Sequence, residues 1–105
     1  MSAIKYLTEE DYEESVRTGC WAVDFYADWC GPCKMMAPDF EAAAGEYGDK
    51  INFAKVDIDA QRKLAVANKV MSIPTLLFYK DGQQADRVVG VIDKTALDHK
   101  LDALL

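Results

Sequence analysis

The sequence predicts an α/β protein in which helices cover both faces of a mixed β-sheet. Helical and strand patterns alternate along the chain in the order β-α-β-α-β-α-β-β-α. The early alternation indicates parallel strands joined by helical crossovers. Two later strands are separated only by Asp81-Gly82, which indicates an antiparallel hairpin. A sheet that contains both kinds of pairing is typically covered by helices on its two faces.

The N-terminal elements are a short strand, a helix and a buried strand. Residues 4–7 predict the short strand, and Thr8 then has the features of a helix N-cap. Acidic residues fill the turn after Thr8, which suits the positive end of the helix dipole. We expect this helix to end at Gly19. The nearly continuous apolar run over 21–27 predicts a central strand covered on both faces, although it contains one acid, Asp24.

A longer helical pattern follows the Cys-Gly-Pro-Cys segment. Its apolar positions recur at helical spacing and are Met36, Phe40, Ala44 and Tyr47. Gly48 is expected to end this helix, and Pro38 inside it predicts a kink. The segment 51–57 predicts another strand. Asp59 then has the position of a cap for a short helix that reaches about Asn68.

The C-terminal part predicts the hairpin and a final helix. Residues 75–80 and 83–91 form the two strands on either side of the Asp81-Gly82 turn. Asp93 has the position of an N-cap for the last helix. The apolar stripe of that helix consists of Leu97, Leu101 and Leu104.

Length and composition limit the possible functions. The 105 residues are enough for one domain, spanning 1–105, whose core needs no disulfide staples. The net charge of −6 argues against nucleic-acid binding, because phosphate contacts need a basic surface. No apolar run is long enough for a signal peptide or a membrane span. We therefore expect a cytoplasmic protein without membrane contact, in a compartment where thiols are kept reduced.

The segment Trp29-Cys30-Gly31-Pro32-Cys33-Lys34 carries the candidate chemistry, between the predicted buried strand and the start of a helix. At that place Cys30 faces unpaired backbone N–H groups and the positive end of the dipole, which both favour thiolate over thiol. Cys33 lies further into the helix and is expected to be less exposed. Cys30 is then expected to attack a substrate disulfide. Cys33 resolves the mixed disulfide, which leaves a Cys30–Cys33 disulfide.

Two cysteines at this spacing can also supply two of the four ligands of a structural zinc site. A closed structural site needs four ligands, and only Cys20 and His99 remain as ligands of the usual kind. His99 lies at a solvated position of the last predicted helix. Cys20 is expected to be a packing residue, with oxidation or dimerisation through its thiol as the alternative. We expect no metal and no separate cofactor, because the dithiol within the chain is itself the redox group.

Over nearly its whole length the sequence resembles the thioredoxin family. The matching segments are residues 23–34, 37–38, 54–57, 72–75, 80–82 and 89–90. The most specific are Cys-Gly-Pro-Cys and, downstream of it, Ile73-Pro74-Thr75. The resemblance implies the thioredoxin fold, a five-stranded mixed β-sheet flanked by four α-helices. It also implies that Pro74 follows a cis peptide bond and packs beside the active-site sulfurs.

The resemblance implies further site residues. A shallow groove for substrate peptides is implied at Trp29, Gly31, Pro32, Ile73, Pro74 and Gly90. Asp24 matches the buried carboxylate of the family, which exchanges protons with Cys33 during resolution. Lys55 matches the family's lysine near this acid and couples to its titration. An ordinary structural pair of Asp24 with Lys55 stays an alternative. Tyr26 departs from the tryptophan of the best-known members, and we expect similar packing from it.

The function implied by the resemblance is that of a protein-disulfide reductase, an electron carrier in cell redox homeostasis. The expected partners are disulfide-containing client proteins and a thioredoxin reductase, an NADPH-dependent flavoprotein, and the expected state is a monomer. A disulfide oxidase or isomerase on the same fold is disfavoured by the Gly31-Pro32 pair and by the missing signal peptide. A non-catalytic interaction module is disfavoured by the joint presence of both cysteines, Asp24 and Pro74.

Overall fold

The structure is a computed structural model that describes residues 4–105, so the first three residues of the predicted 1–105 domain lie outside it. Within the described residues the elements follow the predicted order. The strands are β1 (Lys5–Tyr6), β2 (Cys20–Tyr26), β3 (Asn52–Asp57), β4 (Thr75–Lys80) and β5 (Gln83–Val89). The helices are α1 (Tyr12–Val16), α2 (Gly31–Tyr47), α3 (Arg62–Ala67) and α4 (Lys94–Leu104).

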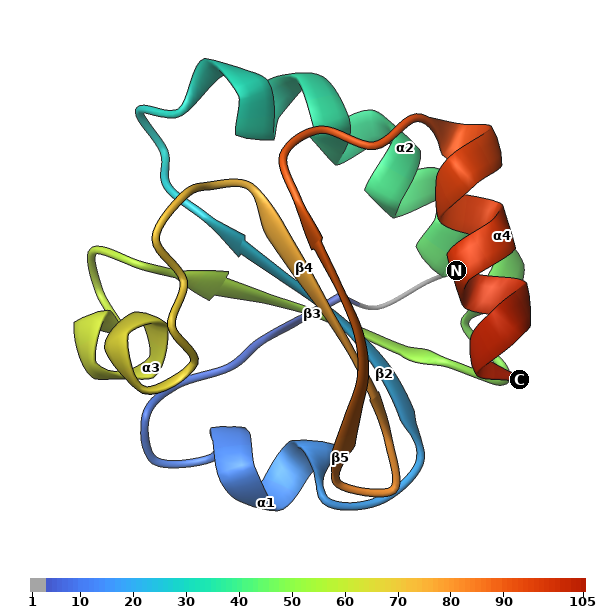
Figure 1. Ribbon diagram of the computed structural model, residues 1–105, viewed down its shortest axis with the longest axis horizontal. Coiled ribbons are helices and arrows are strands. Elements are labelled where there is room, and N and C mark those ends of the chain that lie inside the picture. The colour runs from blue at the N-terminus through green and yellow to red at the C-terminus, as the bar shows by residue number, and fades with distance from the viewer. Residues whose placement is uncertain (1–3) are drawn as a thin grey trace.

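The strands form one mixed sheet in the order β1-β3-β2-β4-β5 (Figure 1). β1, β3 and β2 run parallel, whereas β2, β4 and β5 pair antiparallel. The predicted hairpin joins β4 to β5, with Asp81 at φ 49° and Gly82 at φ 87°. Positive φ at both central residues gives the tight turn whose twist matches that of the strands. The prediction of a mixed sheet with helical crossovers is confirmed.

Alternation along the central strands produces two apolar cores, one on each face of the sheet. Figure 1 shows α2 and α4 on one side of the sheet and α1 and α3 on the other. The core under α2 and α4 includes Ala22, Met36, Phe40, Leu76, Phe78, Leu97 and Leu101. The opposite core includes Tyr12, Val16, Val23, Phe25, Leu77 and Tyr79. Because side chains alternate along a strand, Asp24 and Tyr26 share the face of Ala22 and point toward the α2 layer.

Two helix ends form as predicted. Asp93 caps α4, since its Oδ1 accepts a hydrogen bond from the Ala96 backbone N–H at 2.8 Å. The predicted stripe of leucines on α4 is buried. α2 ends at Tyr47 with Gly48 as its C-cap, and Pro38 lies inside it.

Two helix starts differ from the prediction. α1 begins only at Tyr12, because Thr8 closes a turn: its backbone N–H donates to Asp11 Oδ1 at 2.7 Å, and its carbonyl accepts from the N–H groups of Asp11 and Tyr12. The predicted cap of α3 is also wrong, because Gln61 precedes that helix and makes no side-chain cap bond. Asp59 lies outside α3, and its carboxylate has a partner elsewhere.

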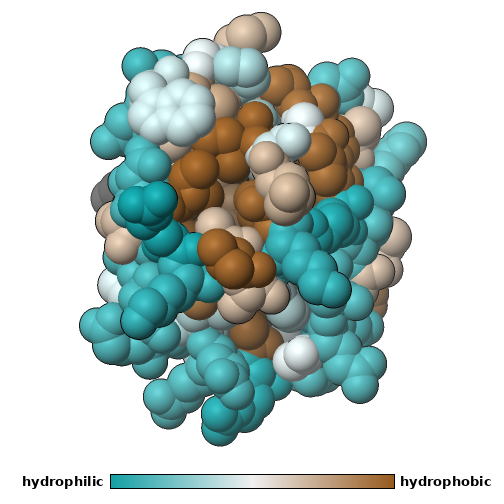
Figure 2. Space-filling view, turned by 60° about the vertical axis from the view of Figure 1, so that its left-hand side comes forward, coloured by the Kyte–Doolittle hydropathy of each residue, from teal (hydrophilic) through white to brown (hydrophobic). Residues whose placement is uncertain are grey.

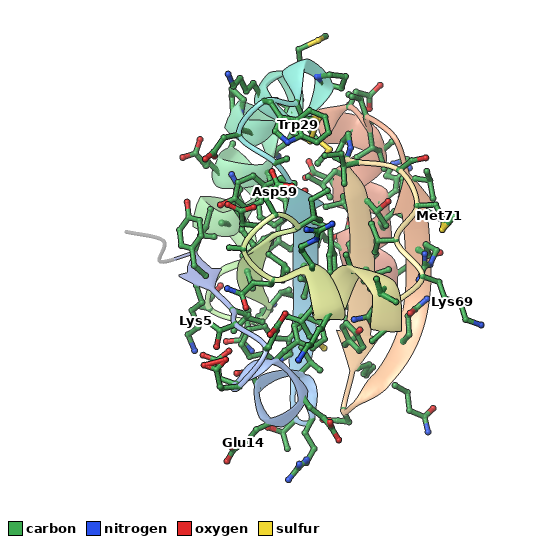
Figure 3. The ribbon with its side chains drawn as sticks, turned by 90° about the vertical axis from the view of Figure 1, so that its left-hand side faces the viewer. Lys5, Glu14, Trp29, Asp59, Lys69 and Met71 are labelled. Carbon is green, nitrogen blue, oxygen red and sulfur yellow. A yellow bond between two sulfur atoms is a disulfide. The ribbon has the colours of Figure 1, made fainter. Side chains whose placement is uncertain are left out.

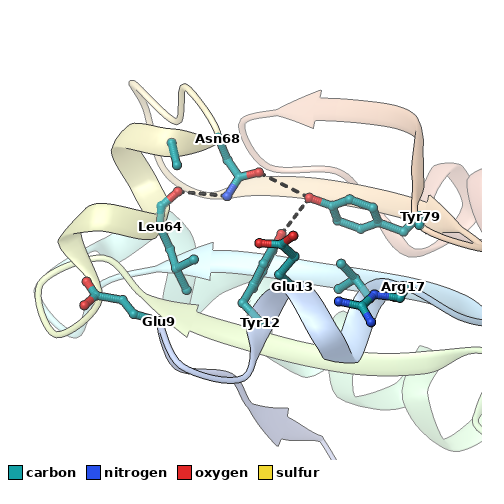
Figure 4. A pocket seen from close by; sticks show the side chains of 10 residues that line it. Glu9, Tyr12, Glu13, Arg17, Leu64, Asn68 and Tyr79 are labelled. Carbon is teal, nitrogen blue, oxygen red and sulfur yellow. Dashed lines mark hydrogen bonds between the residues drawn. The ribbon is translucent and has the colours of Figure 1, made fainter.

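A chain of hydrogen bonds ties α1 and α3 to β4 (Figure 4). The hydroxyl oxygens of Tyr12 and Tyr79 are 2.8 Å apart, and the Tyr79 hydroxyl donates to Asn68 Oδ1 at 3.3 Å. Asn68 in turn donates from its Nδ2 to the Leu64 carbonyl at 2.9 Å. Burial raises the pKa of Tyr12, so this hydroxyl stays neutral. The polar groups of this buried corner therefore satisfy one another, which such groups must do to be stable.

Candidate redox site

The Cys-Gly-Pro-Cys segment lies where β2 passes into α2. Cys30 is the N-cap of α2 with an extended backbone, and Pro32 occupies the first turn, where the missing N–H costs nothing. The backbone N–H of Cys33 donates to Cys30 Sγ at 3.2 Å. Cys30 therefore takes the place of an ordinary capping side chain, and its sulfur faces the positive end of a 17-residue helix. In the dithiol form this position favours a thiolate at Cys30.

Cys30 and Cys33 form a disulfide, with their Cα atoms 5.3 Å apart. This separation lies within the range that disulfide geometry requires. Each cysteine is 4% exposed, so the expectation that Cys33 would be the less exposed residue is wrong in this disulfide form. The bonded sulfurs share one apolar environment, made by Ala27, Ile58 and Ile73.

Three segments distant in sequence meet beside the disulfide. The peptide bond between Ile73 and Pro74 is cis, and the Ile73 carbonyl lies 3.9 Å from Cys30 Sγ. The Gly90 N–H donates to the Pro74 carbonyl at 2.8 Å, and Gly90 has φ 95°, a conformation that favours glycine. The loop before β4 and the end of β5 thus lie next to the start of α2. Of the predicted groove residues, Gly31 and Pro32 are exposed, Ile73 and Gly90 are half-buried and Pro74 is buried.

Trp29 is 68% exposed, and a hydrogen bond from its indole Nε1 to Asp59 Oδ2 at 2.8 Å fixes its ring (Figure 3). The sequence reasoning missed this function of Asp59, because no local pattern links two residues on separate loops. Met71, Val89 and Val91 also expose large apolar side chains. Figure 2 shows apolar residues gathered on one face of the molecule among hydrophilic side chains. Exposed apolar surface of this kind is typical of sites that bind other proteins.

Asp24 is a buried acid without a partner. It is 1% exposed, and neither carboxylate oxygen has a hydrogen-bond partner. Burial raises its pKa to about 7, and the positive charge of Lys55 opposes part of this rise. Lys55 is the register partner of Asp24 on β3, but no ion pair joins them among residues 4–105. A satisfied structural pair therefore does not explain this carboxylate.

The ammonium group of Lys55 has another partner. Its Nζ lies 5.1 Å from the centre of the Tyr26 ring, over the ring face. Tyr26 in turn packs edge-to-face against Tyr6, with the ring centres 6.4 Å apart. These three side chains and Cys33 line a cavity of about 200 Å³. Cys33 therefore borders both the apolar cluster around the disulfide and this cavity, whose lining includes polar side chains.

The raised pKa of Asp24 predicts that stability falls as pH rises. The unfolded chain ionises Asp24 near 3.8, whereas the folded protein holds the proton until about 7. The contribution of the buried neutral acid to folding stability is complete below pH 3.8 and is lost as the pH rises to about 7, the pKa in the folded protein. The unfolding free energy of Asp24→Asn minus that of the wild type should therefore be roughly 2–3 kcal/mol larger at pH 8 than at pH 5.

Urea unfolding of both proteins at pH 5 and pH 8 measures this difference. The comparison between the two pH values removes the effect of the amide itself, which is the same at both. An equal stability difference at pH 5 and pH 8 would show that Asp24 ionises normally in the folded state.

Residues 4–105 contain no group of three His, Cys, Asp or Glu side chains placed to hold a metal ion. None of the helices within this range combines the length and the apolar character needed to cross a bilayer.

Cys20 is a free, half-buried cysteine whose Sγ lies 3.8 Å from the Leu104 carbonyl, at the other end of β2 from the disulfide.

The chemistry that this arrangement supports is reversible exchange of a disulfide. A dithiol at a helix start can open and close its bond, and exposed apolar surface beside it can receive a protein substrate. The fold and the site together define a thiol–disulfide oxidoreductase.

Comparison with known proteins identifies the family. The family model described as Thioredoxin matches residues 3–103, and the chain belongs to the thioredoxin family, whose members are protein-disulfide oxidoreductases. A thioredoxin of Staphylococcus haemolyticus is 45% identical over 100 residues, covering 95% of this chain and 96% of the relative. A thioredoxin of Staphylococcus aureus is 46% identical with the same coverage. The crystal structure of Malassezia sympodialis thioredoxin (Mala s 13) superposes with a TM-score of 0.87 and 34% identity, covering 99% of this chain and 92% of that one.

Proposed function

We propose that this oxidoreductase works as a cytoplasmic protein-disulfide reductase, with Cys30 as the nucleophile and Cys33 as the resolving thiol. The observation that carries the proposal is the Cys30–Cys33 disulfide at the N-terminus of α2, with the Cys33 N–H directed at Cys30 Sγ. In the dithiol form that N–H and the helix dipole stabilise negative charge at Cys30. A reductase must itself be kept reduced, which suits a cytoplasmic site of action.

The proposed reaction has two exchange steps. The Cys30 thiolate attacks one sulfur of a client disulfide, which forms a mixed disulfide and releases the other client sulfur as a thiolate. Cys33 then loses its proton and attacks Cys30 Sγ. This breaks the mixed disulfide, releases the second client thiolate and forms the Cys30–Cys33 bond. Two electrons pass from the dithiol to the client, so a separate reductant must restore the dithiol.

Asp24 is proposed to accept the proton of Cys33 in the second step. It faces the layer that contains α2, both its oxygens are free of partners, and its pKa of about 7 suits proton exchange near neutral pH. Lys55 is proposed to assist by its charge, since it is the register partner of Asp24 and lines the cavity that reaches Cys33. The transfer is proposed to be direct or to pass through one water molecule.

The client is proposed to bind along the surface around the disulfide. Trp29 provides a large exposed ring on one side, and the backbone of the half-buried Ile73 is proposed to pair with an extended client segment. The remaining proposed contacts are Gly31, Pro32, Pro74 and Gly90. We propose that residues 1–105 act as one monomeric domain that contains its own redox group and needs no further cofactor.

A test of the proposed function is the reduction of insulin by dithiothreitol, followed by turbidity. The protein should accelerate precipitation of the insulin B chain over dithiothreitol alone, and an unchanged rate would contradict the proposal. Purified reductases then replace dithiothreitol. We propose an NADPH-dependent flavoprotein thioredoxin reductase as the donor, so NADPH oxidation should depend on both proteins and on insulin. Turnover with a ferredoxin-linked reductase alone would assign the donor differently.

Asp24→Asn should slow the resolving step without unfolding the protein. Above pH 7 the wild-type carboxylate can accept the proton of Cys33, whereas below pH 7 it is already protonated, so the wild-type rate should fall as pH decreases through about 7. The variant should be roughly a hundredfold slower at pH 8 and should lack this inflection. Stopped-flow fluorescence of mixed-disulfide decay measures the rate. A variant profile that keeps the inflection near pH 7 would remove Asp24 from proton transfer.

A further inference from the structure

Register places one lysine between a carboxylate and two aromatic rings. Across three neighbouring strands, Tyr6 pairs with Lys55 and Lys55 pairs with Asp24. Paired residues share a face of the sheet, so these three side chains form a row toward the α2 layer. Tyr26 lies two positions after Asp24 on the same face, which makes it a diagonal neighbour of Lys55. A long side chain at position 55 can therefore reach either Asp24 or Tyr26.

The geometry settles where the ammonium lies. Lys55 Nζ is 5.1 Å from the centre of the Tyr26 ring, within the range of a cation–π contact. Tyr6 braces the same ring edge-to-face. Asp24 meanwhile receives no hydrogen bond from Lys55 or from any other group in residues 4–105. The ring thus holds the cation in a place where it makes no direct pair with the carboxylate, while its charge still lowers the Asp24 pKa.

We propose that Tyr26 is a positioning residue, whose ring face fixes the Lys55 ammonium beside Asp24 and so sets how readily Asp24 exchanges a proton with Cys33. The effect on turnover rests on the proposed function, in which Asp24 accepts the proton of Cys33. The effect of Tyr26 on the Lys55 ammonium and on the titration of Asp24 does not depend on that function. It also accounts for the tyrosine at position 26, because any aromatic face can serve as the partner of the cation.

Other charged and titratable groups lie around this cluster and contribute to the same field. Burial raises the pKa of Tyr26, and the neighbouring groups Asp57 on β3, Tyr6 on β1, and Asp28 and Asp24 of its own segment raise it further. Lys34 and Cys33 of α2 line the cavity together with Asp28. Leu76, the partner of Asp24 on β4, is apolar. Lys55 is the cation whose charge lowers the Asp24 pKa against the larger effect of burial.

The test is a double-variant cycle on the oxidised protein, in which Cys30 and Cys33 do not titrate. The Asp24 carboxyl carbon is followed by NMR from pH 4 to 10 in the wild type, Tyr26→Leu, Lys55→Met and the double variant. Without the ring, the Lys55 ammonium should turn out toward solvent, so Tyr26→Leu should raise the titration midpoint of Asp24 by roughly 0.5–1 pH unit, a fraction of what a neighbouring opposite charge supplies. Tyr26→Phe and Tyr26→Trp should restore the wild-type midpoint, because both keep an aromatic face.

The Lys55→Met background distinguishes two ways in which Tyr26 can act on Asp24. One is to position the Lys55 ammonium, and the other is to keep water away from the carboxylate. If Tyr26 acts through Lys55, Tyr26→Leu should not shift the Asp24 midpoint further once Lys55→Met has removed the cation. Equal shifts in both backgrounds, no shift with lysine present, or a downward shift with lysine present would overturn the proposal. The unsubstituted protein provides a check that needs no variant. Its Lys55 ε-methylene protons should resonate upfield of those of the other lysines, and their absence from that region would also overturn it.

Turnover distinguishes failure of this inference from failure of the proposed function. If the midpoint shifts as expected, the inflection in the resolving rate should move with it in Tyr26→Leu. If Asp24 does not transfer the proton, the NMR midpoint would still shift and the rate profile would not follow. If Asp24 transfers the proton but Tyr26 does not position Lys55, the wild-type rate profile would keep its inflection. The Asp24 midpoints in the NMR cycle would then lack the expected dependence on Lys55.

Discussion

Cys30→Ser should reduce insulin at no more than the rate of dithiothreitol alone. A serine hydroxyl at the N-cap accepts the same backbone hydrogen bond as Cys30 Sγ, so the start of α2 should be retained. It cannot form a disulfide with the client, so the first exchange step is lost entirely. The loss should therefore appear as a full loss of catalysis in a folded protein.

Cys20→Ser is the matched control for this experiment. Cys20 lies at the start of β2, at the opposite end of that strand from the disulfide, and its thiol takes no part in the proposed steps. This variant should retain wild-type activity. Circular dichroism and urea unfolding show whether both variants are folded. Reductase activity in folded Cys30→Ser above the dithiothreitol background would contradict the assignment of the nucleophile.

Cys33→Ser should stop the reaction after the first step and accumulate mixed disulfides. Cys30 keeps its position at the N-terminus of α2 and still attacks a client, but no second thiol is present to resolve the product. Incubation with oxidised insulin should give a covalent adduct at the combined mass of the variant and insulin. Dithiothreitol should release it.

Two comparisons make the trapping result specific. The double variant Cys30→Ser with Cys33→Ser should form no adduct, even though Cys20 is present. Peptide mapping of the single-variant adduct should find the client sulfur on Cys30. Adducts on Cys20, or multiple turnovers without accumulation of an adduct, would show that Cys33 is not the resolving thiol.

Much of the fold follows from local patterns in the sequence. β2 and β4 have nearly continuous apolar runs because each strand contributes to two cores. The Asp81-Gly82 turn is predictable because the backbone conformations of that turn favour these two residues. The cap at Asp93 is equally local. The helix starts at α1 and α3 were harder to predict, because several nearby acids compete for the same backbone N–H groups. At Thr8 the side chain of Asp11 closes a turn instead.

The site also contains residues that local sequence predicts and contacts that it does not predict. Cys30 and Cys33 are recognisable because their reactivity depends on spacing and on a helix start, which both lie within one short segment. The bond between Trp29 and Asp59 depends on how two loops meet and leaves no local signal. The contact between Lys55 and Tyr26 depends on strand register, since a slip of one residue would place the lysine on the other face. The two cysteines are equally buried in the disulfide form, although Cys33 lies further into the helix.

Alkylation of the reduced protein at neutral pH tests the central claim most directly. Iodoacetamide reacts with thiolates, and mass spectrometry gives the separate rates of Cys20, Cys30 and Cys33. In the folded protein, Cys30 should react first and roughly tenfold faster than the same residue does in concentrated urea, where no helix stabilises its charge. A Cys30 that reacts no faster in the folded protein than in the unfolded chain would contradict the account.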